Sequence, residues 1–114
     1  MLKDPKWDVK IESWRQVCLD AADLLERDGW CQHAPMDERG RRCLINAVYS
    51  VGDYMACRDA ERQIKLFIDK PHLSWWNDTD GRTKEQVIAV LRGCAKCVHA
   101  QGVQSILVGG CNIA

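Results

Sequence analysis

Apolar residues near the start of the chain recur at steps of three and four positions. The residues with this spacing are Trp7, Ile11, Trp14, Cys18, Ala21 and Leu25. Such steps bring side chains onto one face of an α-helix, so the spacing predicts an amphipathic helix over about residues 8–27. Asp28-Gly29 should end this helix, because glycine adopts the left-handed C-terminal conformation without steric cost.

Two shorter helices are predicted in the middle of the chain, after a polar loop or short hairpin at residues 31–40. The first is defined by Leu44, Ala47, Val48, Val51 and Met55, and the second by Ala60, Ile64, Phe67 and Ile68. Gly52 weakens the first by about 1 kcal/mol relative to alanine. Pro71 ends the second, because proline has no backbone donor. Whether the two helices are joined or kinked between Gly52 and Asp59 is left open by the sequence.

The last helix begins at a capping box. Thr83 precedes Gln86 by three positions, so the side chain of each can bond the backbone N–H of the other. Apolar residues on one side extend the helix to about residue 99; they are Val87, Ile88, Leu91, Cys94, Ala95 and Val98. Residues 73–82 before it are rich in turn formers and contain two adjacent tryptophans, which cannot both point inward from a regular helix, so we expect an ordered loop anchored by aromatic side chains.

These elements predict a compact all-α, or nearly all-α, domain of four helices over residues 1–101. The first and last helices should pack their apolar faces together, with Trp30 and one of Trp75 or Trp76 at the join. Residues 102–114 form an apolar, glycine-flanked tail, for which a short strand, a packed arm and an exposed segment for homo-oligomerisation are the alternatives. With 114 residues the chain matches one domain.

Charge and cysteine usage indicate a cytoplasmic protein without a membrane segment. Sixteen basic and sixteen acidic residues cancel, so no net field favours nucleic acid or anionic lipid. The charged first residues, 1–6, lack the apolar region of a signal peptide. Seven cysteines is an odd number, and without a secretory signal we expect reduced thiols rather than a disulfide framework.

Three short motifs give the chain a family resemblance. They are Gly29-Trp30-Cys31-Gln32, Trp76-Asn77-Asp78 and Gly81-Arg82-Thr83, with Cys43 opening a helix between the first and the second. In this arrangement residues 14–98 resemble a family of short bacterial and bacteriophage proteins known only as a domain of unknown function. Asp80-Gly81 stands where the family pattern has a proline-glycine turn. The resemblance implies a compact helical fold and brings no activity with it.

Two groups of cysteine and histidine have the composition of a zinc or thiol site. The first group is Cys31, His33 and Cys43, and the second is Cys94, Cys97, His99 and Cys111. The alternative is that the thiols are small core residues, because the Cys94–Cys97 pair lies within an amphipathic helix rather than in a glycine-flanked turn. We therefore expect no cofactor, and zinc is the alternative.

The tryptophan-rich segment is the expected contact surface for a protein partner. Its candidate residues are Trp75, Trp76, Asn77, Asp78 and Arg82. Exposed tryptophan beside charge is typical of interface anchors, whereas the alternative is that these side chains only form turns leading to the helix cap.

The arginine-rich segments offer a second kind of partner. Arg39, Arg41 and Arg42, or Arg58, Arg62 and Lys65, would have to carry nucleic-acid binding. Glu61 lies four residues before Lys65, which favours an ordinary solvated ion pair. No phosphate-binding loop, catalytic triad or dinucleotide fingerprint is present in the sequence. The sequence therefore favours a non-enzymatic protein-binding or regulatory accessory module of bacterial or phage type.

Overall fold

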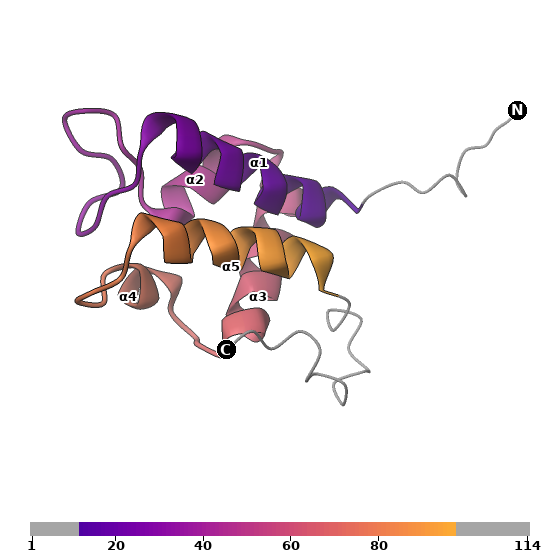
Figure 1. Cartoon of the computed structure of the whole chain (residues 1–114). Coiled ribbons are helices and arrows are strands. Elements are labelled where there is room, and N and C mark those ends of the chain that lie inside the picture. The colour runs from indigo at the N-terminus through magenta and orange to yellow at the C-terminus, as the bar shows by residue number, and fades with distance from the viewer. Residues whose placement is uncertain (1–11, 98–114) are drawn as a thin grey trace, which may run out of the picture.

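The computed structural model describes residues 12–97 and contains five helices in that range (Figure 1). They are α1 (Ser13–Asp28), α2 (Leu44–Ser50), α3 (Tyr54–Ile68), α4 (Leu73–Asn77) and α5 (Lys84–Lys96). Within these residues β-structure is limited to two isolated bridges, both involving Arg42. The predicted all-α class is confirmed. Trp7, Ile11 and the 102–114 tail lie outside the described residues. Within residues 12–97, no helix is long and apolar enough to cross a bilayer.

Helix α1 buries the apolar face that its spacing predicts. Trp14, Cys18 and Leu25 are all buried in the core. Gly29 ends the helix with φ 103°, and its N–H donates to the carbonyl of Leu25 over 2.8 Å. Its ψ of 162° differs from the left-handed helical cap that was predicted. A Cβ at Gly29 would stand 2.6 Å from Cγ of Arg41, so glycine is also required by the close approach of that side chain.

Helices α1 and α5 lie side by side, as predicted (Figure 1). The capping box of α5 is present, with Thr83 and Gln86 each donating a backbone N–H to the other's side chain over 3.1 Å. At the other end, Arg15 of α1 donates from Nη1 to the carbonyl oxygens of Ala95, at 2.8 Å, and Cys97, at 2.7 Å. These carbonyls belong to the end of α5, which stops at Lys96, earlier than predicted.

The predicted continuation of the second helix through Val51 and Met55 is wrong. Helix α2 ends at Ser50, and Asp53 starts α3 by accepting a hydrogen bond from the backbone N–H of Ala56 at 2.9 Å. In a continuous helix the Ala56 N–H would donate to the carbonyl four residues earlier. Because it donates to the Asp53 side chain instead, a new helix begins at Tyr54. Gly52 lies in the break, where a Cβ would come within 2.7 Å of Cγ2 of Val17.

Helix α4 is a single short helix in a segment predicted to be a loop, so residues 12–97 contain five helices rather than the predicted four. Leu73 anchors its start in the core, and the carbonyl of Trp76 accepts a hydrogen bond from Nε of Arg82 at 2.9 Å. Trp76 is half-buried against the core, whereas Trp75 is exposed. The two rings thus diverge, as expected of adjacent helical residues, and Trp76 rather than Trp75 accompanies Trp30 at the core.

Candidate functional site

Asn77, at the end of α4, is fully buried and joins three segments of the chain. Its Oδ1 accepts hydrogen bonds from Nε1 of Trp30 at 2.7 Å and from the backbone N–H of Leu44 at 3.0 Å. Its Nδ2 donates to the carbonyl of Cys31 at 3.2 Å and to Oδ1 of Asp78 at 2.9 Å. Every donor and acceptor position of the amide is therefore used, which holds α4 rigidly against α2 and the loop before it.

The motifs that are separate in the sequence meet around this asparagine. Gln32 donates from Nε2 to the carbonyls of Asn77 and Thr79, each at 3.0 Å. The guanidinium of Arg82 lies 3.9 Å from the ring centroid of Trp76, and burial lowers the pKa of Arg82. Trp76, Asn77 and Arg82, which the sequence predicted for a contact surface, are thus tied into the packing of the domain.

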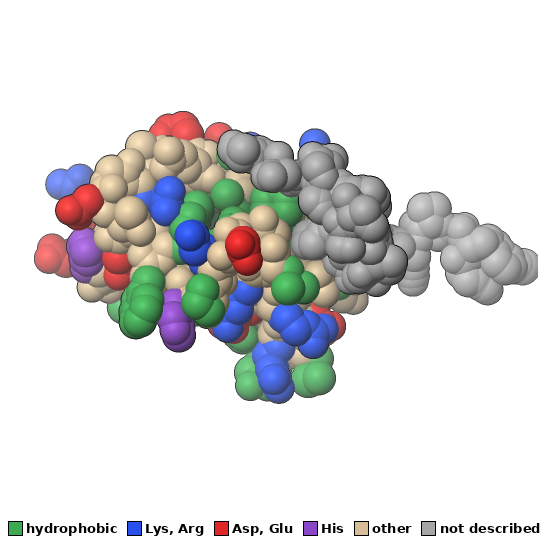
Figure 2. Space-filling model, turned by 90° about the horizontal axis from the view of Figure 1, so that it is seen from below, with side chains coloured by type: hydrophobic (Ala, Val, Ile, Leu, Met, Phe, Trp, Pro, Cys, Tyr) green, Lys and Arg blue, Asp and Glu red, His purple; other side chains and the backbone are tan. Residues whose placement is uncertain are grey.

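Trp75 is the member of the predicted surface that stands out from the fold, with 72% of its surface exposed. Its ring lies 4.2 Å, centroid to centroid, from that of His72, at a tilt of 46°. The carbonyl of Trp75 accepts from Oγ1 of Thr79 at 3.0 Å, so its backbone is fixed although its ring is open. Figure 2 shows a face on which exposed hydrophobic side chains lie beside histidine and basic side chains.

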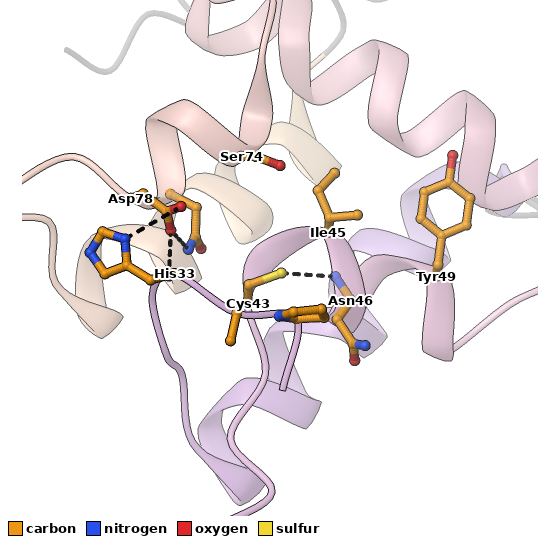
Figure 3. Close-up of a pocket in the computed structure, with 10 residues that line it drawn as sticks. His33, Cys43, Ile45, Asn46, Tyr49, Ser74 and Asp78 are labelled. Carbon is orange, nitrogen blue, oxygen red and sulfur yellow. Dashed lines mark hydrogen bonds and ion pairs between the residues drawn. The ribbon is translucent and has the colours of Figure 1, made fainter. Parts of the chain in front are cut away.

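A hollow of about 460 Å³ lies between α2, α4 and the loop before α2 (Figure 3). His33 and Asp78 stand at one end and Tyr49 at the other, with Ile45 and Ser74 between them (Figure 3). The walls are mainly apolar, and the remaining lining residues are Ala34, Pro35, Cys43, Asn46 and Asn77.

Asp78 caps the C-terminal end of α4 and carries a fixed charge at the edge of this hollow. Its Oδ1 accepts from the backbone N–H of His33 and from Nδ2 of Asn77, both at 2.9 Å. Partial burial by itself would raise the pKa of Asp78, but these two hydrogen bonds outweigh it and the pKa lies below the usual value. His33 adopts φ 67°, and its Nδ1 lies 3.8 Å from Oδ2 of Asp78.

A second hollow of about 240 Å³ adjoins the first and shares Ile45 and Ser74 with it. Its other lining residues are Glu61, Lys65, Pro71, His72, Leu73 and Trp75. We call the two hollows together the α2–α4 groove.

Glu61 contacts a residue of each hollow, Tyr49 of the first and Lys65 of the second. Its Oε2 pairs with Nζ of Lys65 at 3.2 Å, as the spacing predicted, and its Oε1 accepts from the hydroxyl of Tyr49 at 2.6 Å. Burial, followed by the hydrogen bond to Glu61, raises the pKa of Tyr49 well above its usual value. The tyrosine is thus a neutral wall of the groove at any physiological pH.

The first predicted metal group is not brought together. The Cys31 thiol donates to the carbonyls of Arg41 at 3.2 Å and Ala34 at 3.4 Å, and burial raises its pKa. Cys43 instead caps α2, where Sγ accepts from the backbone N–H of Asn46 at 3.3 Å. Between residues 12 and 97 no three His, Cys, Asp or Glu side chains are arranged to hold a metal ion.

The second predicted metal group falls partly outside the described residues, where His99 and Cys111 lie. Cys94 is buried on the core face of α5, and its hydrogen bond with Cys18, then burial, raises its pKa. Cys97 is buried at the end of the same helix. Within the described chain the position of Cys94 agrees with a core role.

Several side chains of the two predicted basic clusters make local hydrogen bonds or ion pairs. Nε of Arg41 lies 2.6 Å from Oδ2 of Asp37, and Arg42 donates to the side chains of Asn46 and Ser50 at 2.8 and 3.2 Å. On α3, Arg62 pairs with Asp59 at 3.1 Å. Nothing in this geometry favours a nucleic-acid surface over solvated pairs.

Several lining residues of the groove have no signal in the sequence. Ile45, Asn46 and Ser74 belong to no motif, and their role follows only from the way α2 lies against α4. Tyr49 lies in α2 and His72 immediately precedes α4, and neither position in the sequence distinguishes a groove wall from an ordinary surface.

Comparison with known protein families gives a match over most of the chain. Residues 12–96 match the model of a family described as a family of unknown function, DUF6197. No curated protein and no solved structure matches the chain. The matched range covers all five helices and the motif contacts around Asn77.

Proposed function

The chain belongs to DUF6197, a family whose function is unknown, and on that premise we propose that it is a non-enzymatic module that binds a protein partner through the α2–α4 groove and Trp75. Its role would be that of an accessory or regulatory protein of bacterial or bacteriophage type. A protein of this kind acts by contact and needs no catalytic group.

The exposure of Trp75 is the observation that carries this proposal. Trp14, Trp30 and Trp76 are all buried or packed against the core, whereas most of the Trp75 ring meets solvent. Tryptophan is among the residues most enriched at the energetic centres of protein interfaces. An exposed ring on this helix therefore favours a surface that a partner covers.

The rigidity of α4 supports the same conclusion. Asn77 ties the end of the helix to Trp30 and Leu44, and Arg82 holds the carbonyl of Trp76. A side chain on a fixed backbone loses less conformational freedom on binding, so more of its contact energy appears as affinity. The adjoining groove offers concave apolar surface in which a partner's side chains can be buried.

The test compares Trp75→Ala with Leu66→Ala. Leu66 is also an exposed large apolar residue, at 57%, but it lies on α3 and does not line the groove. The tagged chain is used to isolate partners from its source cells, each candidate is purified, and its Kd is measured by calorimetry. Circular dichroism checks that both variants fold.

We expect one partner that binds the unmodified chain stoichiometrically and loses at least about 30-fold in affinity with Trp75→Ala, the factor that corresponds to an interface hot spot of roughly 2 kcal/mol. Leu66→Ala should leave the Kd within about twofold. Equal binding of the two variants, or partners that bind only substoichiometrically, would contradict the proposal.

A further inference from the structure

We propose that the larger hollow of the α2–α4 groove receives a lysine or arginine side chain of the protein partner, with the Asp78 carboxylate as its counter-charge. This inference rests on the proposed function, because it names the chemistry of the partner at the same site.

The permanent charge that lines the hollow is negative. Among the described lining residues Asp78 is the only carboxylate and there is no lysine or arginine, while His33 carries a positive charge only when it is protonated. The hydrogen bonds from His33 and Asn77 favour the ionised form of Asp78, so the negative charge persists at neutral pH. A hollow whose described lining has one carboxylate and no lysine or arginine favours a positively charged occupant over an acidic one when His33 is neutral.

One oxygen of the carboxylate remains available for such an occupant. Both short hydrogen bonds go to Oδ1 of Asp78, whereas Oδ2 lies 3.8 Å from Nδ1 of His33, a separation that makes an ion pair only when the histidine is protonated. That distance exceeds a hydrogen bond. The Asp78 side chain is 33% exposed, so an entering ammonium or guanidinium group can reach it.

The rest of the hollow matches the uncharged part of a basic side chain. Ala34, Pro35 and Ile45 line it together with the Tyr49 ring (Figure 3). Lysine and arginine bury their methylene stems along apolar surface while the charged head keeps a polar partner. A wholly apolar occupant would displace water from the Asp78 carboxylate without supplying a hydrogen bond in its place, and this desolvation is unfavourable.

The position of the hollow relative to Trp75 fits a single partner segment. Ser74 and Ile45 line both hollows, and Trp75 lines the second. Because the two hollows adjoin, a segment that places a basic residue against Asp78 can extend into the second hollow, which Trp75 lines.

The probe for this inference is N-acetyl-arginine methylamide, compared with its citrulline analogue, which has nearly the same shape and no charge. Both are titrated into the ¹⁵N-labelled full chain and followed by NMR, at about pH 8, where histidine is generally neutral and so does not offset the carboxylate. We expect the arginine probe to shift the amides of residues lining the hollow and to bind about fivefold more tightly than the citrulline probe. Equal binding of the two probes, or shifts confined to other surfaces, overturns the inference.

Two variants assign the charge. Asp78→Asn keeps an Oδ1 acceptor for His33 and Asn77 but removes the charge, so it should abolish the preference for arginine over citrulline. Asp80→Asn is the control, because Asp80 is exposed in the same segment and does not line the hollow; it should leave the preference unchanged. Preference that survives in Asp78→Asn overturns the inference, and the comparison of probes on the unmodified chain stands even if that variant does not fold.

The remaining outcomes separate this inference from the proposed function. Tighter binding of putrescine than of blocked arginine would overturn the assignment to a protein side chain. If Trp75→Ala loses its partner while the two blocked probes bind equally, the basic side chain is wrong and the protein-binding module stands. If arginine is preferred but Trp75→Ala leaves the Kd of the partner unchanged, the protein-binding role assigned to Trp75 is wrong.

Discussion

Trp30 donates its indole N–H to Oδ1 of Asn77 over 2.7 Å, joining residues that are 47 positions apart in the sequence. Because Asn77 also bonds the start of α2 and the carbonyl of Cys31, one buried amide aligns both walls of the groove. The groove therefore depends on the same network that stabilises the fold.

Replacing Asn77 by alanine should destabilise the domain strongly. The change leaves the indole N–H of Trp30, the backbone N–H of Leu44 and the carbonyl of Cys31 without their partner in a buried environment. We expect a loss of at least about 3 kcal/mol in the free energy of unfolding, measured by urea denaturation. Trp30→Phe removes one donor and part of the packed ring and should cost about 1 to 2 kcal/mol, so it gives a readout even if the alanine variant does not fold. Losses below about 0.5 kcal/mol for both would show that the network is not structural.

Arg15→Ala should weaken the packing of α1 against α5. The guanidinium donates to two carbonyls at the C-terminal end of α5 and is only 15% exposed, so its loss should cost about 2 kcal/mol in urea denaturation. Arg92→Ala is the matched control, because Arg92 also joins α5 to α1, through Asp23 and Glu26, but on the surface. It should cost under about 1 kcal/mol. The reverse order of the two losses would contradict the capping role of Arg15.

Alanine should be tolerated differently at two glycines that both have positive φ. Gly81, with φ 86°, has open space where a Cβ would lie, so Gly81→Ala should cost only the backbone strain, about 1 kcal/mol. Gly29→Ala adds a clash with the Arg41 side chain and should cost at least about 2 kcal/mol. Thermal or urea denaturation measures the loss of stability in the two variants. Equal losses for Gly81→Ala and Gly29→Ala would contradict the predicted order.

Acid should remove stability that Asp78 contributes. Its pKa is lowered in the folded state, so the contribution is fully present above the pKa of an unfolded aspartate, about 3.9, and is lost as the pH falls through the lower folded value. Urea denaturation at a series of pH values should show that Asp78→Asn loses less stability than the unmodified chain between about pH 4 and pH 2. Identical acid dependence of the two proteins would mean that the Asp78 carboxylate is not held in its ionised form.

Local signals in the sequence were sufficient for the two helices that frame the domain. The Thr83–Gln86 capping box and the spacing from Trp14 to Leu25 depend on neighbouring residues, and both are confirmed. The break at Gly52 is not predicted, because the apolar spacing continues to Met55 and favours one longer helix, whereas the Asp53 cap starts a new one.

The groove could not be predicted from the sequence, because long-range contacts create it. No local pattern shows that Asn77 will bond Trp30 and Leu44, and without those bonds residues 73–77 read as a loop. The sequence likewise could not choose which of two adjacent tryptophans is buried, a choice that depends on Arg82 covering Trp76.

The most direct test of the binding role is site-specific photo-crosslinking in the source cells. A benzoylphenylalanine residue is placed at position 74 in one protein, where the side chain is exposed and lines the groove beside the intact Trp75, and at exposed position 66 in the control. The proposed function predicts a discrete crosslinked adduct with one protein at position 74 and none at position 66. No adduct at position 74, or the same adducts at both positions, would contradict it.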